Sequence, residues 1–297
     1  MDDQQEDVRT KFDVDKHLID NVWEDKTKGL RKELLDFQFT TIVKASELSK
    51  CLVEVLEIQN FNSESHKSNY LSADTIEKEF WIEIGHGLTP IDCYIEIFLQ
   101  QMLTNETSKC TIATKSSGDI SFTLRLKQIE FGGYYCEQSS TEMFELAKLY
   151  KDNGVKIFKS FPLFAQNYFN LAAKCLLPFN PSDDINACDS DLKKEEFEEL
   201  LQNVYLNIAA CLLKQQRYED TVHVLKYTVS QENPSEKSIY RLAQAFFHLK
   251  QYTNAKNTIE RTNFKNNKEL AQLMTKIDEH LKVDHDEYSN MVKKMFA

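Results

Sequence analysis

The first part of the chain, up to residue 131, contains short apolar runs that alternate with polar positions. The clearest run is 120–131, where apolar and polar side chains alternate almost strictly every two residues. This period is typical of a β-strand that buries one face. Similar patterns predict further strands at residues 40–43, 51–58, 80–84 and 110–113. Residues 91–103 instead carry apolar side chains at helical spacing, so we predict an antiparallel sheet with one short helix packed on it.

After residue 140 the apolar period becomes helical and an internal repeat emerges. Ala209 and Tyr218 recur further along the chain as Ala243 and Tyr252, at one and the same interval. This interval, about 34 residues, with small and aromatic residues at fixed places, is typical of the tetratricopeptide repeat (TPR), a pair of antiparallel helices. Each pair buries its apolar face only by stacking on its neighbours. These two copies predict repeats at residues 202–235 and 236–266.

A third and less regular copy precedes these two, at about residues 147–178. Gly154 takes the small position of its first helix, and Ala165, Phe169 and Ala172 lie on its second. The interval from Gly154 to Ala209 is longer than one repeat by more than half a repeat. The excess is a polar stretch, which we expect to form a loop with a helix extension.

The predicted organisation is an α+β chain with two structured parts. An antiparallel β domain with one short helix occupies residues 35–133, and an all-α superhelix of three TPRs occupies residues 140–265. Residues 267–297 carry an amphipathic apolar pattern, so we expect a C-terminal extension helix that caps the last repeat. Residues 1–34 form a charged N-terminal segment, in which the apolar spacing around Trp23 suggests a short helix.

Composition favours helices and disfavours several functional classes. The 297 residues include 7 glycines and 5 prolines, far below the roughly 12% that these two residues usually contribute. The net charge of −11 opposes non-specific binding to nucleic acid, which depends on neutralising phosphates. No apolar stretch approaches the roughly 20 residues that cross a bilayer, and no secretory leader is visible. We expect a cytoplasmic protein, with the nucleus as a further location.

The seven cysteines are odd in number and widely spaced. They form no Cys-x-x-Cys motif and no Cys/His ligand spacing, so neither a zinc site nor a redox motif is predicted. We expect reduced thiols, no metal, no cofactor and no catalytic residue.

Four hydrogen-bond donors stand on the first helices of the repeats, which line the inner groove of stacked TPRs. They are Lys151, Asn207, Lys237 and Arg241. Lys237 and Arg241 are four residues apart, so they share one helix face. Three cations and an amide suit a terminal carboxylate together with an acidic side chain, because charge-assisted hydrogen bonds each contribute about 1.5–3 kcal/mol. We therefore predict that this groove binds the acidic end of another polypeptide.

These segments resemble the TPR domain of the large FK506-binding (FKBP) immunophilins. The similar stretches are residues 151–159 (KDNGVKIFK), 206–213 (LNIAACLL), 236–243 (EKSIYRLA) and 288–297 (YSNMVKKMFA). In that family the matching positions form a carboxylate clamp for the C-terminal peptide of the chaperone Hsp90, which ends in Glu-Glu-Val-Asp. The resemblance therefore implies Lys151, Asn207, Lys237 and Arg241 as clamp residues and Hsp90 as partner, and it leaves open whether Hsp70 competes for the groove. Many such clamps have an Asn four residues after the first Lys, where this chain has Val155.

The resemblance extends to residues 80–102 and 120–131, and so implies an FKBP-like β domain in the first half. Active members isomerise prolyl bonds in an apolar pocket with a Trp on the short helix, a Phe-Asp pair on an early strand and a flap with an Ile-Pro-Pro run. Here the Trp position falls on Ile95, no Phe-Asp pair lies between Val43 and Trp81, and eleven residues replace the flap. We expect a degenerate FKBP-like domain without isomerase activity.

Three functions of different classes follow. The first is an Hsp90 co-chaperone or adaptor, whose TPR groove binds the chaperone while the FKBP-like domain contacts an unidentified client or second partner. The second is an enzyme, a divergent peptidyl-prolyl cis-trans isomerase. The third is a scaffold of germline or receptor complexes that does not depend on Hsp90. None of the three includes a nucleic acid or membrane as direct partner.

Overall fold

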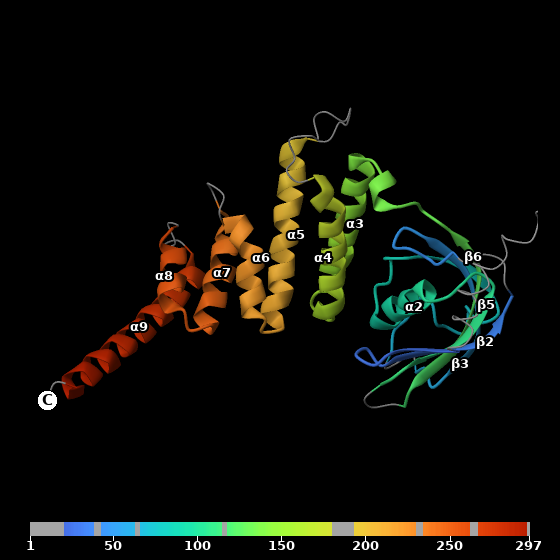
Figure 1. The fold of residues 1–297 in the computed structure, drawn as a ribbon, viewed down its shortest axis with the longest axis horizontal. Coiled ribbons are helices and arrows are strands. Elements are labelled where there is room, and N and C mark those ends of the chain that lie inside the picture. The colour runs from blue at the N-terminus through green and yellow to red at the C-terminus, as the bar shows by residue number, and fades with distance from the viewer. Residues whose placement is uncertain are drawn as a thin grey trace, which may run out of the picture. The chain divides into compact units, whose positions relative to one another are not determined.

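The computed structural model describes residues 21–38, 43–62, 66–114, 118–179, 193–229, 234–261 and 267–295. The chain forms two compact units, Met1–Gln138 and Ser139–Ala297. Figure 1 shows strands in the first unit and helices in the second. The boundary follows Gly132, which lies so close to the chain at Leu48 that a Cβ would overlap the Leu48 carbonyl oxygen.

The first unit is built on a six-stranded antiparallel sheet. Its strands are β1 (Val22–Asp25), β2 (Leu30–Phe37), β3 (Lys50–Gln59), β4 (Glu79–Glu83), β5 (Glu106–Ile112) and β6 (Ile120–Glu130). In space they follow the order β1-β2-β5-β6-β3-β4. The predicted strands at 51–58, 80–84, 110–113 and 120–131 correspond to β3, β4, β5 and β6. The strand predicted at 40–43 lies outside the described residues except for Val43, which is in no strand.

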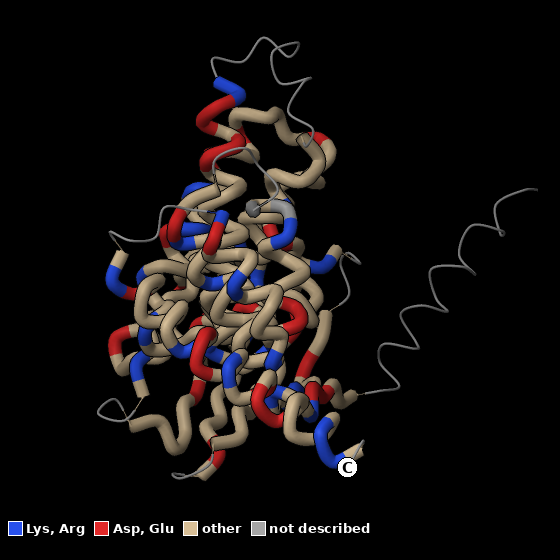
Figure 2. Tube along the Cα trace, turned by 90° about the vertical axis from the view of Figure 1, so that its left-hand side faces the viewer, with Lys and Arg blue, Asp and Glu red and all other residues tan. Residues whose placement is uncertain are grey.

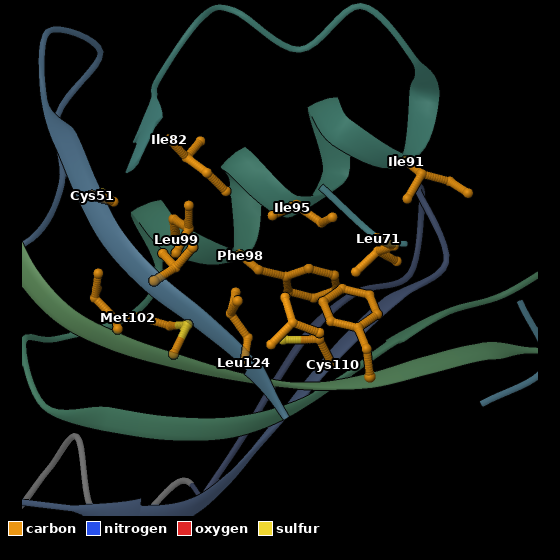
Figure 3. Close-up of a cluster of buried hydrophobic side chains, with 14 of the residues drawn as sticks. Cys51, Leu71, Ile82, Ile91, Ile95, Phe98, Leu99, Met102, Cys110 and Leu124 are labelled. Atoms are coloured by element: carbon orange, nitrogen blue, oxygen red, sulfur yellow. The ribbon is translucent and has the colours of Figure 1, made fainter. Parts of the chain in front are cut away.

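One helix, α2 (Pro90–Gln100), packs on this sheet, as the sequence predicts. Thr89 caps it, because its hydroxyl accepts a hydrogen bond from the Asp92 backbone N–H at 3.1 Å. Pro90 opens the helix where the missing N–H costs nothing. Apolar side chains on one face of α2 are buried against the strands, among them Ile95, Phe98 and Leu99 (Figure 3).

The sheet also includes residues that the sequence places in the N-terminal segment 1–34. Residues 22–37 contribute β1 and β2, and Val22–Asp25 is a strand where the apolar spacing suggests a helix. The alternation of apolar and polar residues is broken in β2, because the charged Lys32 occupies an inward-facing position where an apolar residue is expected. Lys32 is buried, and its ammonium group forms an ion pair with the buried Glu106 of β5.

In its described residues, the second unit has three consecutive helix pairs and a final helix. The helices are α3 (Ser140–Ile157), α4 (Pro162–Leu176), α5 (Lys194–Lys214), α6 (Tyr218–Val229), α7 (Glu236–His248), α8 (Tyr252–Glu260) and α9 (Lys268–Met295). Short 3₁₀ turns at Tyr135–Glu137 and Leu177–Phe179 precede α3 and follow α4. The predicted helix extension is present, because α5 runs to 21 residues from Lys194.

The first helix pair depends on the small residue that the repeat pattern identifies. A Cβ on Gly154 of α3 would stand 2.6 Å from Cε1 of the Phe169 ring on α4. Ala165 and Ala172 of α4 are also fully buried. The missing side chain therefore lets the two helices approach closely enough for the ring to lie against the α3 backbone.

The last helix, α9, is longer than the pair that it covers. Its first half buries Leu270, Leu273, Met274 and Ile277 in one cluster with residues of α7 and α8. From residue 282 onward almost every side chain of α9 is exposed. Figure 1 shows this second half running on beyond α7 and α8.

Candidate functional site

The helices that carry the four predicted groove residues are neighbours. Asn207 lies on α5 and Arg241 on α7, and one Arg241 nitrogen, Nη1, donates a hydrogen bond to the backbone carbonyl of Leu206 at 2.6 Å. Arg241 therefore crosses from the third repeat to the second and ends beside Asn207. The structure brings these two predicted residues together.

Arg241 is a partly buried cation that has a carbonyl partner but no acidic one among the described residues. Burial lowers the pKa of its guanidinium, since the charge has lost part of its hydration. The group stays protonated, because free Arg titrates above pH 12. A guanidinium has five N–H donors, so Arg241 retains donors for an anionic ligand.

The two predicted lysines differ in their surroundings. Lys237 lies one turn before Arg241 on α7 and is exposed. Lys151 lies on α3, where its ammonium nitrogen is 2.9 Å from Oδ1 of the adjacent Asp152. An acidic ligand would have to compete with Asp152 for Lys151. The residue one turn after Lys151 is the exposed Val155, which cannot donate a side-chain hydrogen bond.

A cavity of about 290 Å³ lies further along the same face of the repeats, between α7 and α9. Its lining includes Tyr240, Gln244 and Phe247 of α7 and Gln272, Leu273 and Lys276 of α9. Sequence reasoning did not identify it. The cavity depends on how far α9 stands from α7, and no residue pattern reports that distance.

The interior of the first unit is packed with apolar side chains. Ile95 of α2, the position where the sequence analysis expects a Trp in active isomerases, is 0% exposed. Trp23 of β1 packs edge-on against Phe98 of α2, with ring centroids 6.1 Å apart. Residues 113–119 connect β5 to β6, whose pairing extends to Ile112 and Ile120. The interior thus consists of packed aliphatic and aromatic side chains (Figure 3).

Two buried carboxylates of α2 hold the neighbouring loops in place. The Glu96 carboxylate accepts hydrogen bonds from the backbone N–H groups of Gly85, His86 and Gly87 at 2.9, 3.0 and 2.6 Å. Asp92 accepts from the backbone N–H of Asn69 at 3.0 Å. Burial raises the pKa of Glu96 to about 7, although the three N–H donors act in the opposite direction. These acids are engaged in structural contacts.

The described residues contain no cluster of three or more His, Cys, Asp or Glu side chains that could hold a metal ion. Nor do they include a helix with the length and apolarity to cross a membrane.

Comparison with known proteins identifies the family that has this architecture. The "BDBT FKBP like N-terminal" family model matches residues 23–131, and the "Bride of doubletime-like, TPR domain" model matches residues 139–223. The Drosophila melanogaster protein Bride of doubletime is 37% identical over 279 residues, which are 93% of this chain and 97% of that protein. This chain belongs to the Bride of doubletime family. The resemblance to FKBP-like TPR immunophilins is thereby confirmed, together with the α+β fold of an FKBP-like sheet domain followed by TPR helices.

Two further similarities agree with the family. A crystal structure of residues 1–211 of CG17282 is 37% identical in sequence and has a TM-score of 0.60. The match covers 67% of the present chain and 95% of the CG17282 chain. Tetratricopeptide repeat protein 9C of Xenopus tropicalis is 38% identical over 63 residues, 20% of this chain and 35% of that protein.

Proposed function

We propose that this protein is a non-catalytic adaptor, a cytoplasmic co-chaperone whose TPR groove binds the acidic C-terminal peptide of Hsp90. Lys151, Asn207, Lys237 and Arg241 form its carboxylate clamp. The sequence leaves open whether Hsp70 competes for the same groove. The FKBP-like unit contacts a client or second partner.

The environment of Arg241 carries this proposal. A partly buried guanidinium without an acidic partner in the described residues is unfavourable unless a ligand supplies the missing charge. Arg241 also reaches the backbone next to Asn207, because its hydrogen-bond acceptor is the carbonyl of Leu206. A peptide carboxylate could accept hydrogen bonds from both. Lys237, one turn away on the same helix, adds a second charge for an acidic side chain.

The test is titration calorimetry of the full chain with a synthetic pentapeptide that ends in Glu-Glu-Val-Asp. We expect binding that weakens as salt increases, because exposed charge pairs are screened. Amidation of the peptide C-terminus should remove most of the affinity. Lys237→Ala should weaken binding by roughly 10- to 150-fold, the equivalent of losing one charge-assisted hydrogen bond.

Lys268→Ala is the matched control, since Lys268 is an exposed lysine near the start of α9. It should leave the affinity unchanged. Lys237 is exposed, so its loss should not alter the helical fold, and circular dichroism would verify this. Absence of salt-sensitive binding by the wild-type chain, or equal binding of the amidated peptide, would refute the clamp.

The non-catalytic role of the FKBP-like unit is supported by its filled interior. Prolyl isomerisation has a barrier of about 18–20 kcal/mol, which an isomerase lowers by enclosing the twisted imide in an apolar pocket. Ile95 and Phe98 are both fully buried in that region. In a proline-containing peptide assay we expect the uncatalysed rate. Acceleration that a pocket ligand inhibits would instead support the divergent isomerase.

A further inference from the structure

The apolar face of α9 is repeated in its second half. Leu270, Leu273, Met274 and Ile277 have counterparts at one constant interval further along the helix, and these are Tyr288, Met291, Val292 and Met295. The interval equals five full turns of an α-helix, so each counterpart lies on the same side of α9 as its original. The same side of α9 therefore carries an apolar stripe in each half, interrupted between the halves by Asp284 and His285.

The two halves of this stripe have different surroundings. The first half is buried against α7 and α8. In the second half Tyr288 is 63% exposed, Met291 54% and Met295 72%. No described residue covers them. Large apolar side chains at i, i+3 and i+7 on one exposed helix face indicate a surface that another helix covers.

Charges beside the second half indicate which helix fits. Glu287 and Lys294 are seven residues apart and so lie along the same flank of the stripe. When two identical helices pack antiparallel, equal flanks meet. Glu287 of one copy then lies near Lys294 of the other, and the two-fold axis generates this pair twice. In a parallel pair, opposite flanks meet, and Glu287 would not face Lys294.

We propose that residues 286–295 of α9 form an antiparallel homodimer contact with a second copy of this chain. Tyr288, Met291 and Met295 form its apolar centre, and the Glu287–Lys294 pairs set its direction. This segment is about 15 Å long. Such a contact is small, so the association is weak and depends on protein concentration. It does not depend on the clamp, which lies on other helices.

The experiment is sedimentation equilibrium of the full chain over a wide concentration range. Wild-type protein should show a monomer–dimer equilibrium. Tyr288→Glu and Met291→Glu should each raise the dissociation constant at least tenfold. Val283→Glu is the matched control, because Val283 is 53% exposed on the opposite side of the same helix and should change little. Unchanged circular dichroism would show that the variants keep α9 helical.

Charge exchange tests the direction of packing. Glu287→Lys or Lys294→Glu alone should weaken the dimer by placing like charges opposite each other. The double variant should restore it, and an equimolar mixture of the two single variants should form a heterodimer. A monomeric wild-type chain at the highest concentration, or Val283→Glu as damaging as Tyr288→Glu, would overturn the proposal. Failure of the double variant and of the mixture to associate would overturn the antiparallel arrangement.

Discussion

The two units differ in whether a buried cationic side chain has an acidic partner. In the FKBP-like unit the buried Lys32 has the buried Glu106 as its partner, and Glu106 also accepts hydrogen bonds from the Leu103 backbone N–H at 2.8 Å and the Ser108 hydroxyl at 2.7 Å. In the TPR unit the partly buried Arg241 has a single backbone carbonyl among the described groups. The first arrangement is complete without a ligand, whereas the second gains from one.

This contrast agrees with the different roles that we propose for the two units. Satisfied buried charges and a filled interior stabilise a fold and leave no demand for a small ligand. A cation that lacks an acid costs stability, and it is retained where a binding partner compensates for it. Basic and acidic residues are interspersed along the chain (Figure 2), so the sign of the charges does not distinguish the units.

The largest expected effect concerns the filled interior. Phe98→Ala removes a fully buried ring that packs edge-on against Trp23 and Phe122. We expect the unfolding free energy of the first unit to fall by about 3–5 kcal/mol, while peptide binding by the groove persists. Chemical denaturation of the full chain would measure the loss. Trp81→Ala, at a half-exposed site, should cost less; equal losses would show that the interior is loosely packed.

Glu96 provides a pH-dependent test of the same interior. Its pKa is raised from 4.5 to about 7 in the folded protein, so between these values the native state binds more protons than the unfolded chain. The unfolding free energy should therefore fall as pH rises from 4.5 to 7, by about 3 kcal/mol in total, and level off above.

Glu96→Gln keeps an oxygen for the loop N–H groups of residues 85–87 and removes the titration. Denaturant melts of wild type and variant at several pH values would show a slope in the first that is missing in the second. A slope of the same size in Glu96→Gln would assign the pH dependence to another group.

A smaller effect is expected at the tight contact in the first repeat. Gly154→Ala would force a methyl group against the Phe169 ring, so we expect a loss of about 1–3 kcal/mol in stability. Thermal unfolding followed by circular dichroism would detect it. Val155→Ala, at the next and exposed position, should stay within about 0.5 kcal/mol. A stabilised Gly154→Ala would mean that α4 moves away without penalty.

The smallest effect concerns Lys151 of the proposed clamp and its ion pair with Asp152. Asp152→Asn removes the acid that occupies Lys151 and should strengthen binding of the acidic peptide by up to about fivefold, because exposed ion pairs contribute at most about 1 kcal/mol. Asp220→Asn, which breaks the Arg217 pair at the start of α6, is the control. Titration calorimetry of both variants with the acidic peptide would measure the difference in affinity. Weaker binding in Asp152→Asn would place Lys151 outside the groove.

Periodicity predicted much of this fold because it reflects packing directly. Asn207 and Arg241 are separated by one full repeat period, so they occupy equivalent places in consecutive repeats and had to lie on neighbouring helices. Alternation likewise located β3 to β6. It failed for β2, where Lys32 points inward and is neutralised by Glu106 of β5, a partner far away in the sequence. A pairing at that distance leaves no local pattern.

The candidate site was predictable in its residue types and in the helices that carry them. Two features were not. The hydrogen bond from Arg241 to the Leu206 carbonyl depends on the spacing of α5 and α7, and the pairing of Lys151 with Asp152 depends on side-chain rotamers. Both are set by three-dimensional geometry. That the four donors act together as one clamp is still a prediction.

The side chains beneath α2 also bear on drug binding. Ile95 and Phe98 are both fully enclosed in the apolar interior. From the non-catalytic role that we propose for this unit, we expect no binding of a macrolide such as FK506, and calorimetry of the full chain with the drug would measure it.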